Sequence, residues 1–316
     1  MKNNIKISSF LILTSLFFST ELLAWGFFGH KKINELAVYT LPVEMIGFYK
    51  NNINYIIEKS VQPDKRRYID PSEAPRHYID IDHFGDSAIY KMPHNWYSAV
   101  ELYSEDTLKA YGIVPWHILL LKKLLTDAFM EGDFETALRI STDIGHYIAD
   151  SNVPLHTTEN YNGQLTGQHG IHGLWESRLP ELYFNEYNLF VGKASYLNHG
   201  SVSIWASITN AHLALDSVLN FEKTVSENIG EESKYSFENR GKSYVKVYSQ
   251  KFCKEYHAAL NNMVERQMRR AIRLIGDIWY SCWIDAGQPD LPYYSGKEIS
   301  DDSTGTALIV PNRIHE

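Results

Sequence analysis

Apolar residues recur at helical spacing along most of the 316-residue chain. Runs of alternating β-branched residues are nearly absent, and only residues 77–84 are typical of an extended segment. The pattern predicts helices over residues 31–50 (interrupted near Pro42 and Gly47), 52–60, 115–130, 134–150, 201–228 and 243–286. We therefore predict an all-α fold of packed helices, with one domain over residues 25–290 and an irregular tail over residues 291–316.

Residues 1–24 have the organisation of a secretory signal peptide. Lys2 and Lys6 precede an apolar run over residues 7–18, and Ala24 is a small residue at a suitable cleavage position. We expect cleavage after Ala24 and export to the periplasm or the exterior of the cell. The alternative is an uncleaved N-terminal anchor. No later stretch is long and apolar enough to predict a transmembrane helix.

The charge of the chain limits how it can attract a substrate. The formal net charge is −8, and loss of residues 1–24 would make it one unit more negative, because two lysines and one glutamate leave. An acidic protein does not attract polyanions through its overall field. An anionic substrate would therefore need a local positive charge, which a bound metal ion can supply.

Cys253 and Cys282 are the two cysteines of the sequence. Both fall in the helix predicted over residues 243–286, where a rise of 1.5 Å per residue would separate them by about 43 Å. A disulfide needs Cα atoms within roughly 7 Å of each other. Export would permit a disulfide, but unless the helix folds back we expect two free, buried thiols.

The region from residue 144 to residue 180 holds histidines and carboxylates at spacings suited to metal binding. His146 and Asp150 lie four residues apart in a predicted helix, and His172 and Glu176 repeat this spacing. Residues four apart share one face of a helix. His156 follows soon after the first pair. A single pair is more typical of a solvated ion pair, but two pairs and a further histidine predict a zinc site with more than one metal ion.

Further candidate ligands precede this region. Asp64 and His77 could add a carboxylate and an imidazole, although Asp64 could instead cap a turn and His77 could be a hydrogen-bonded core histidine. The α-amine and carbonyl of Trp25, free after signal cleavage, could chelate a metal ion together with His30. The alternatives are a buried aromatic residue that anchors the terminus and a histidine at the start of a helix.

Four motifs occur along the chain in a specific order. They are Trp25-Gly26-x-x-Gly29-His30, Asp64 with His77-Tyr78-Ile79-Asp80, Gly145-His146-x-x-x-Asp150-x-x-x-Pro154-Leu155-His156, and His172-x-x-Trp175-Glu176. Over residues 25–176 the chain resembles the superfamily of bacterial zinc-dependent phospholipases C and single-strand-specific zinc nucleases of fungi and plants. The resemblance implies a single all-helical domain around a trinuclear zinc site. After residue 176 only the helical character is comparable.

The resemblance also implies how the candidate ligands divide among three zinc ions. The first zinc ion would be held by Asp64, His77, His146 and Asp150. The second would be held by His156, His172 and Glu176. The third would be held by the amine and carbonyl of Trp25, by His30, and by Asp150, which would bridge two metal ions.

The function implied by the resemblance is hydrolysis of phosphodiesters by attack of a zinc-bound hydroxide. Asp64 would orient the hydroxide or take its proton. Arg67 would contact the phosphate, although it could equally be a surface charge in a basic run. Asp80 matches a carboxylate that recognises a base in the nucleases, and Tyr78 stands where they often have phenylalanine, so both are candidate substrate-binding residues.

The motifs carry features of both branches of this superfamily. The five-residue interval from Trp25 to His30 and the presence of Asp80 resemble the nucleases. Glu176 and the short interval from His156 to His172 resemble the phospholipases. We predict a nuclease acting on single-stranded nucleic acid or nucleotides, with a phospholipase C that cleaves phospholipid head groups as the alternative. An exported zinc-binding protein without turnover is a third hypothesis, and no obligate protein partner is inferred.

Overall fold

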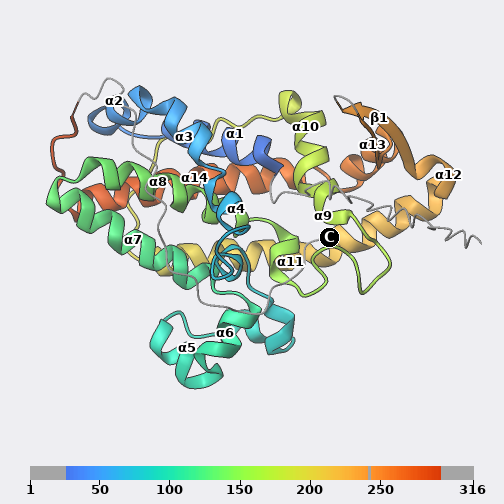
Figure 1. Cartoon of the computed structure of the whole chain (residues 1–316), viewed down its shortest axis with the longest axis horizontal. Coiled ribbons are helices and arrows are strands. Elements are labelled where there is room, and N and C mark those ends of the chain that lie inside the picture. Colours follow the sequence, from blue (N-terminus) through green and yellow to red (C-terminus); the bar gives the residue numbers. More distant parts are fainter. Residues whose placement is uncertain (1–25, 241–242, 293–316) are drawn as a thin grey trace, which may run out of the picture.

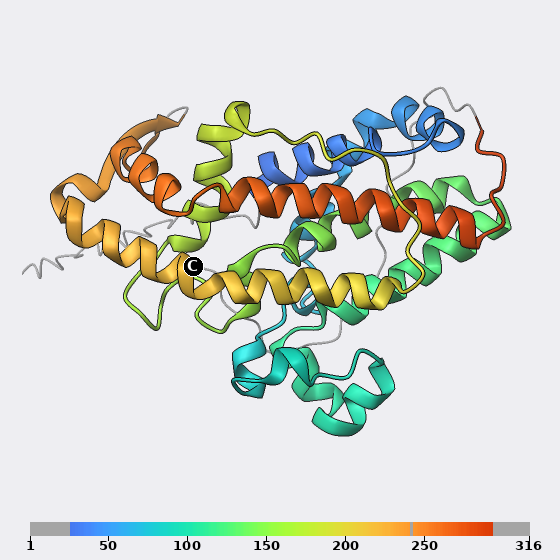
Figure 2. The same cartoon turned by 180° about the vertical axis from the view of Figure 1, so that it is seen from behind.

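Three long helices run side by side through the middle of the molecule. They are α7 (Val114–Glu131), α8 (Phe134–Asp150) and α14 (Met263–Asp285), and α1 (Gly26–Val38) packs on α8 and α14 (Figure 1). α11 (Gly200–Ile229) lies alongside α14 in the view from behind and also contacts α7 (Figure 2). The computed structural model describes residues 26–240 and 243–292, which form a single, mostly helical body.

The apolar pattern located the long helices well. α7, α8 and α11 begin and end within one residue of the predicted bounds, and so does α3 (Ile53–Lys59). The helix predicted over residues 31–50 is divided into α1 and α2 (Val43–Asn51). The break at Pro42 is confirmed, because proline lacks the N–H that would continue α1. The interruption at Gly47 is wrong, since Gly47 lies inside α2.

Several short helices complete the body, and most of them were not predicted. The α-helices are α4 (Gln62–Arg66), α5 (Trp96–Tyr103), α6 (Glu105–Tyr111), α9 (Ile171–Gly173), α10 (Leu179–Tyr183), α12 (Glu231–Lys234) and α13 (Gln250–Ala259). The shorter 3-10 turns include η1 (Ala74–His77), η2 (Ile81–Phe84) and η4 (Pro154–Thr157). Segments this short span too few turns to give a clear helical period in the sequence.

A two-stranded hairpin corrects the prediction of an all-α chain. β1 (Tyr235–Arg240) pairs antiparallel with β2 (Ser243–Tyr248), and Tyr235 lies opposite Tyr248. Residues 243–248 alternate polar and apolar side chains with two valines, which is a strand pattern. The helix predicted from residue 243 therefore begins too early. It is also broken into α13 and α14, because Asn261 and Asn262 adopt positive φ angles.

The extended segment predicted over residues 77–84 is also wrong. It contains the end of η1 and all of η2, and Tyr78 between them has an extended backbone. The backbone N–H of Ile79 donates to the carbonyl of His156, and that of Asp80 donates to the carbonyl of Tyr111. These amides bond to separate turns and not to a neighbouring strand, so no sheet forms here.

A glycine allows α1 to approach α8 closely. A Cβ added at Gly145 would lie 1.8 Å from the side-chain oxygen of Asn34. The Asn34 amide in turn donates to the backbone carbonyl of His30. Because His146 follows Gly145 directly, this close packing sets the ring of His30 on the ring of His146, with centroids 3.9 Å apart. The fold thereby brings two candidate ligands from different helices together.

Both cysteines are free and buried, as predicted. Cys253 lies in α13 and Cys282 lies in α14. Burial raises the pKa of Cys282 to about 12 and that of Cys253 to about 11, so both thiols stay protonated at neutral pH. Within the residues described, no helix combines the length and the apolar character needed to cross a bilayer. The predicted signal peptide, Trp25 and the tail from residue 293 lie outside the described residues.

Candidate metal centre

The C-terminal end of α8 forms the middle of a buried cluster of histidines and carboxylates. His146 and Asp150 lie one turn apart on the same face of α8, and neither residue is exposed. The helix is held in position at its other end, where Asp133 accepts a hydrogen bond from the backbone N–H of Thr136. After Asp150 the chain turns into η4, which carries His156. One short stretch therefore supplies three of the candidate ligands.

Six further elements converge on this end of α8 or continue from it. The residues they contribute are His30 (α1), Asp64 (α4), His77 (η1), His156 (η4), His172 (α9) and Glu176 (η5, Leu174–Arg178). Each of these residues is at most 5% exposed. The fold thus brings together all eight predicted metal ligands that the structure describes, from segments up to 146 residues apart in the chain. Three sets of three ligands are spaced to hold metal ions, and two of these sets share His146.

The first set is centred on His146. Its Nε2 atom lies 3.2 Å from Asp150 Oδ2, 3.1 Å from His77 Nδ1 and 3.7 Å from Asp64 Oδ1. His77 Nδ1 is also 2.9 Å from Asp150 Oδ2 and 3.8 Å from Asp64 Oδ1. The ligand atoms of His77, His146 and Asp150 therefore lie close enough together to hold one ion, and Asp64 lies beside them.

The second set contains His156, His172 and Glu176. The two Nε2 atoms lie 3.0 Å apart, and Glu176 Oε2 is 3.4 Å from His156 Nε2 and 3.0 Å from His172 Nε2. Glu176 lies in a π-helical turn. Pro180 lacks the N–H that would bond to the carbonyl of residue 176 in an α-helix, which favours this wider turn. Such turns are frequent at functional sites.

Asp150 connects the first set to His30 through its two oxygens. Oδ2 faces His77 and His146, whereas Oδ1 lies 3.4 Å from His30 Nε2 and 3.7 Å from His156 Nδ1. His30 also forms a set of its own with Asp64 and His146. A carboxylate placed in this way can bind one metal ion with each oxygen. The described residues offer His30 and Asp150 for a third ion, while Trp25 lies outside them.

The spacing of these atoms suits tetrahedral zinc. Bonds of 2.0–2.1 Å to nitrogen and 2.0–2.2 Å to oxygen place neighbouring ligand atoms of a tetrahedral ion about 3.3 Å apart. The atom pairs named above for the first two sets are 2.9 to 3.8 Å apart. Two pairs of imidazole nitrogens face each other at about this distance. His146 Nε2 lies 3.1 Å from His77 Nδ1, and His156 Nε2 lies 3.0 Å from His172 Nε2. The geometry therefore fits bound cations between the atoms.

Several buried atoms of the cluster lack a hydrogen-bond partner among the described residues. They are both ring nitrogens of His30, both carboxylate oxygens of Asp64, Nε2 of His77, Oδ1 of Asp150 and Oε2 of Glu176. A buried polar atom without a partner costs about 1–3 kcal/mol. So many in one place would destabilise the fold unless a ligand satisfied them. Metal ions would satisfy the oxygens of Asp64, Asp150 and Glu176 and one ring nitrogen of His30. His77 Nε2 lies instead on the side of Glu73.

The electrostatics of the cluster also favour bound cations. Burial alone would raise the pKa of Asp150, but the adjacent His146 and His156 hold it well below its usual range. Burial alone would lower the pKa of His146, but Asp150 and Asp64 raise it to about 9. Burial lowers the pKa of His30, so this imidazole is neutral and able to bind metal. The buried carboxylates require nearby positive charge, which metal ions would provide in place of protons.

Backbone carbonyls orient two of the imidazoles. His146 Nδ1 lies 2.8 Å from the carbonyl of Ser60, and His156 Nδ1 lies 2.8 Å from the carbonyl of His77. A carbonyl only accepts, so each Nδ1 carries a proton and donates it. Each Nε2 is then left as the lone-pair nitrogen that faces the cluster. This fixing of the tautomer is usual for histidines that bind metal.

A buried glutamate behind His77 was missed by the sequence analysis. Glu73 is not exposed, and its Oε1 lies 3.7 Å from His77 Nε2. It accepts hydrogen bonds from Arg66, Arg76 and the hydroxyl of Tyr147. Burial alone would raise the pKa of Glu73, but His77, Arg66 and Arg76 hold it well below its usual range. Glu73 and His77 are four residues apart, a spacing that could have indicated the pair.

We expect Glu73→Gln to weaken metal binding by about 10–100-fold, because His77 would lose the negative charge that lies 3.7 Å from its Nε2 atom. Affinity for zinc can be measured by competition with a chromophoric chelator. Glu58→Gln is a matched control, since Glu58 forms an ion pair with Lys31 but its side chain is 65% exposed. An affinity for Glu73→Gln equal to that of the control would contradict the role assigned to Glu73.

The predicted catalytic and substrate-binding residues lie at different depths. Arg67 extends beside Asp64, with Nη1 3.9 Å from Oδ1, and its side chain is 17% exposed. Tyr78 and Asp80 are almost fully buried. Arg67 therefore lies where its guanidinium can contact an anionic substrate bound beside Asp64. A contact between substrate and Tyr78 or Asp80 stays a prediction.

No known protein family matches the sequence, and no curated protein matches it. The case for a function therefore depends on the residues of the cluster and on their arrangement.

Proposed function

We propose that this protein is a zinc-dependent hydrolase of phosphodiesters whose active site is the buried cluster. The observation that carries the proposal is the position of Asp150, which faces histidines of different sets with its two oxygens. A carboxylate shared in this way is typical of sites that hold two or more metal ions, and such sites stabilise both the attacking and the leaving oxygen of a phosphoryl displacement.

The donor set favours zinc over the other common metal ions. Five imidazoles and three carboxylates make up the cluster within the described residues. Calcium and magnesium prefer sites made entirely of oxygen. Zinc accepts both imidazole nitrogen and carboxylate oxygen in tetrahedral geometry. We further propose three zinc ions, the third completed by the N-terminal amine and carbonyl of Trp25 after signal cleavage.

The side chains around the cluster can perform the remaining chemistry. Bound zinc lowers the pKa of a coordinated water to near 7 and so supplies a nucleophile at neutral pH. Neither oxygen of Asp64 accepts a hydrogen bond from a described residue, so this carboxylate is available to orient water or take a proton. Arg67 can place its guanidinium on a phosphate oxygen, because it already lies next to Asp64. The burial of the cluster limits access of bulk water.

We propose a single-stranded nucleic acid or a nucleotide as the substrate, and a phospholipid as the alternative. The support for a nuclease is the resemblance at Trp25, His30 and Asp80. The support for a phospholipase is Glu176. Export from the cell, proposed from residues 1–24, is compatible with both substrates.

The substrate class can be tested with the processed, zinc-loaded protein. We expect release of nucleotides from single-stranded DNA and no release of diacylglycerol from phosphatidylcholine vesicles. Asp64→Asn, which keeps the size of the side chain but removes its charge, should abolish most of this hydrolysis. Release of diacylglycerol alone would favour the phospholipase. Failure to cleave either substrate would reject phosphodiester hydrolysis of these two classes.

A further inference from the structure

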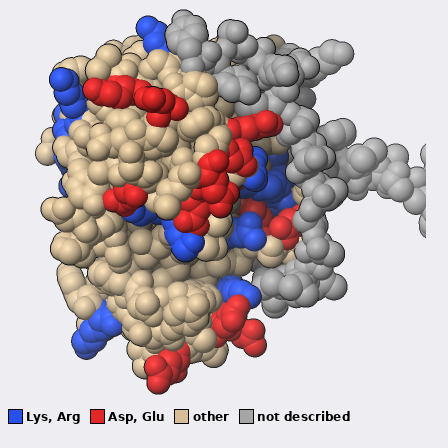
Figure 3. Space-filling model, turned by 90° about the vertical axis from the view of Figure 1, so that its left-hand side faces the viewer, with Lys and Arg blue, Asp and Glu red and all other residues tan. Residues whose placement is uncertain are grey.

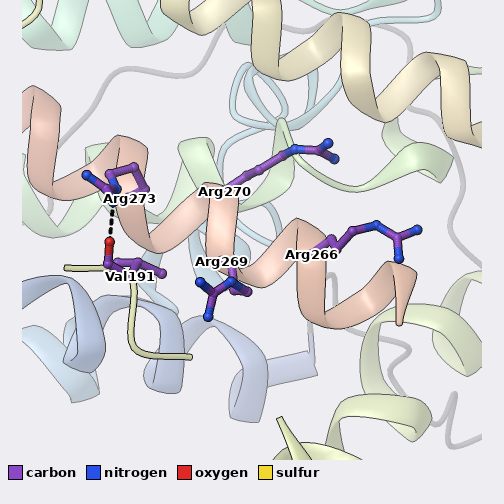
Figure 4. Close-up of a pocket in the computed structure, with 5 residues that line it drawn as sticks. All are labelled: Val191, Arg266, Arg269, Arg270 and Arg273. Atoms are coloured by element: carbon purple, nitrogen blue, oxygen red, sulfur yellow. Dashed lines mark hydrogen bonds between the residues drawn. The ribbon is translucent and has the colours of Figure 1, made fainter. Parts of the chain in front are cut away.

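Four arginines form a stripe on the N-terminal half of α14. Arg266, Arg269, Arg270 and Arg273 lie at intervals of three, four and seven residues, so they share one side of the helix. With Val191 they line a hollow of about 300 Å³. Figure 4 shows the four side chains leaving one helix, with Arg273 bonded to the carbonyl of Val191 and with Arg266 and Arg270 extending away from it.

None of the four guanidiniums forms an ion pair with a carboxylate of the described residues. Arg269 donates to the carbonyl of Asn188, Arg273 donates to the carbonyls of Val191 and Lys193, and Arg270 donates to the side-chain oxygen of Gln267. Glu265, on the same helix, accepts a hydrogen bond with Oε1 from the backbone N–H of Asn188. Each guanidinium has five N–H donors, so most of them stay available.

The charges of the stripe repel one another. Burial and the neighbouring Arg266 lower the pKa of Arg270. This concentration of positive charge contrasts with the acidic chain as a whole. The end of the molecule shown in Figure 3, for example, carries a diagonal band of Asp and Glu with Lys and Arg beside it. An anion bound at the stripe would relieve the repulsion. Groups with planar oxygen pairs, such as phosphate, match the guanidinium fork.

An aromatic groove adjoins the arginine stripe. It is lined by Tyr39, Phe184, Tyr187 and Phe190, and it shares Val191 with the hollow of the stripe. Tyr39 is 51% exposed and Phe190 is 83% exposed. The segment from Tyr187 to His199 runs along α14 on the side seen in Figure 2. Basic and aromatic side chains therefore form one continuous surface.

We propose that this surface, made of the arginine stripe and the aromatic groove, binds single-stranded nucleic acid. Phosphates would lie on the arginines while unpaired bases stack on Tyr39 and Phe190, which is how proteins hold single strands without reading their sequence. The inference rests on the proposed phosphodiester hydrolase and specifies its substrate. No candidate metal ligand lines either hollow, so the surface is separate from the metal centre.

The shape of the surface favours a strand over a membrane. Arginines and exposed aromatic residues also occur in proteins that bind anionic lipids. Here, however, the arginines line a hollow, and the aromatic residues line a groove beside it. A flexible strand can follow both hollows, whereas a flat bilayer would meet only exposed side chains such as Phe190.

The test measures binding of a short, fluorescein-labelled oligothymidylate by fluorescence anisotropy, with Asp64→Asn present in every protein to prevent cleavage. We expect Arg266→Glu with Arg270→Glu to weaken binding by about tenfold or more, and to reduce the slope of log affinity against log salt by roughly 1.4, for two phosphate contacts. Phe190→Ala should weaken binding by at least about fivefold through loss of stacking.

The matched control is Lys50→Glu with Lys223→Glu, which reverses two exposed charges on α2 and α11 and should leave binding unchanged. Thermal unfolding of each variant separates a folding defect from a loss of contacts. Equal affinity in the arginine variant and this control would overturn the proposal, and so would binding to anionic vesicles in place of the oligonucleotide. Hydrolysis of a small phosphodiester by the wild-type protein is measured separately. Its absence would reject the proposed function and leave the binding result standing.

Discussion

Asp150→Asn is expected to abolish hydrolysis almost completely, with a fall in kcat/KM of about 10³-fold or more. Metal ions at a site of this kind supply several kcal/mol of transition-state stabilisation, and each 1.4 kcal/mol corresponds to a factor of ten. Asp150 lies within 3.4 Å of a ring nitrogen of His30, of His77 and of His146. Its substitution should therefore weaken more than one metal site. Activity and zinc content of the purified variant are the two readouts.

Asp143→Asn is the matched control for this variant. Asp143 lies seven residues earlier on α8, and its side chain, 16% exposed, pairs with Arg66 and not with a candidate ligand. The control should lose some stability, about 1–3 kcal/mol for a broken charged hydrogen bond, but should keep its zinc. Equal zinc contents in the two variants would show that Asp150 has no special role in holding metal.

Removal of metal should lower the midpoint of thermal unfolding by roughly 10 °C or more. A ligand that binds only the folded state stabilises it by about 4 kcal/mol at a concentration of 1,000 times its Kd. Two or three ions together therefore contribute enough for a shift of this size in a chain this long. The structural cause is the burial of Asp64, Asp150 and Glu176, whose charges lose their positive partners when metal leaves.

Calorimetry of the protein before and after treatment with a chelator measures this shift. Addition of zinc to the chelated protein should restore the original midpoint. Asp150→Asn provides the control, because chelation should change its midpoint much less than that of the wild type. A wild-type midpoint that does not respond to chelation would mean that the cluster is stable without metal and that its polar atoms are satisfied in some other way.

The sequence predicted the residues of the cluster better than the segments that hold them. His146, Asp150, His172 and Glu176 could be recognised because four-residue spacing is a local property that a helix converts directly into a shared face. The approach of His30 to His146 could not be recognised in this way. It depends on tertiary packing, and the space that Gly145 leaves for Asn34 appears only in the structure.

Errors in the predicted secondary structure have a common origin. The pattern of residues 243–248 is too short to outweigh the long helical period that follows it, so β2 was assigned to a helix. The amides of Ile79 and Asp80 bond to distant turns, which no local pattern indicates. The sequence placed the arginine stripe of α14 in a helix but could not show that these arginines lack carboxylate partners. That property depends on which elements pack around α14.

The metal content of the processed protein tests the central claim most directly. Purified protein that begins at Trp25 would be analysed for metals by mass spectrometry after removal of loosely bound ions. We predict close to three zinc ions per chain. A content of one ion or none would contradict a cluster that holds several metal ions around Asp150.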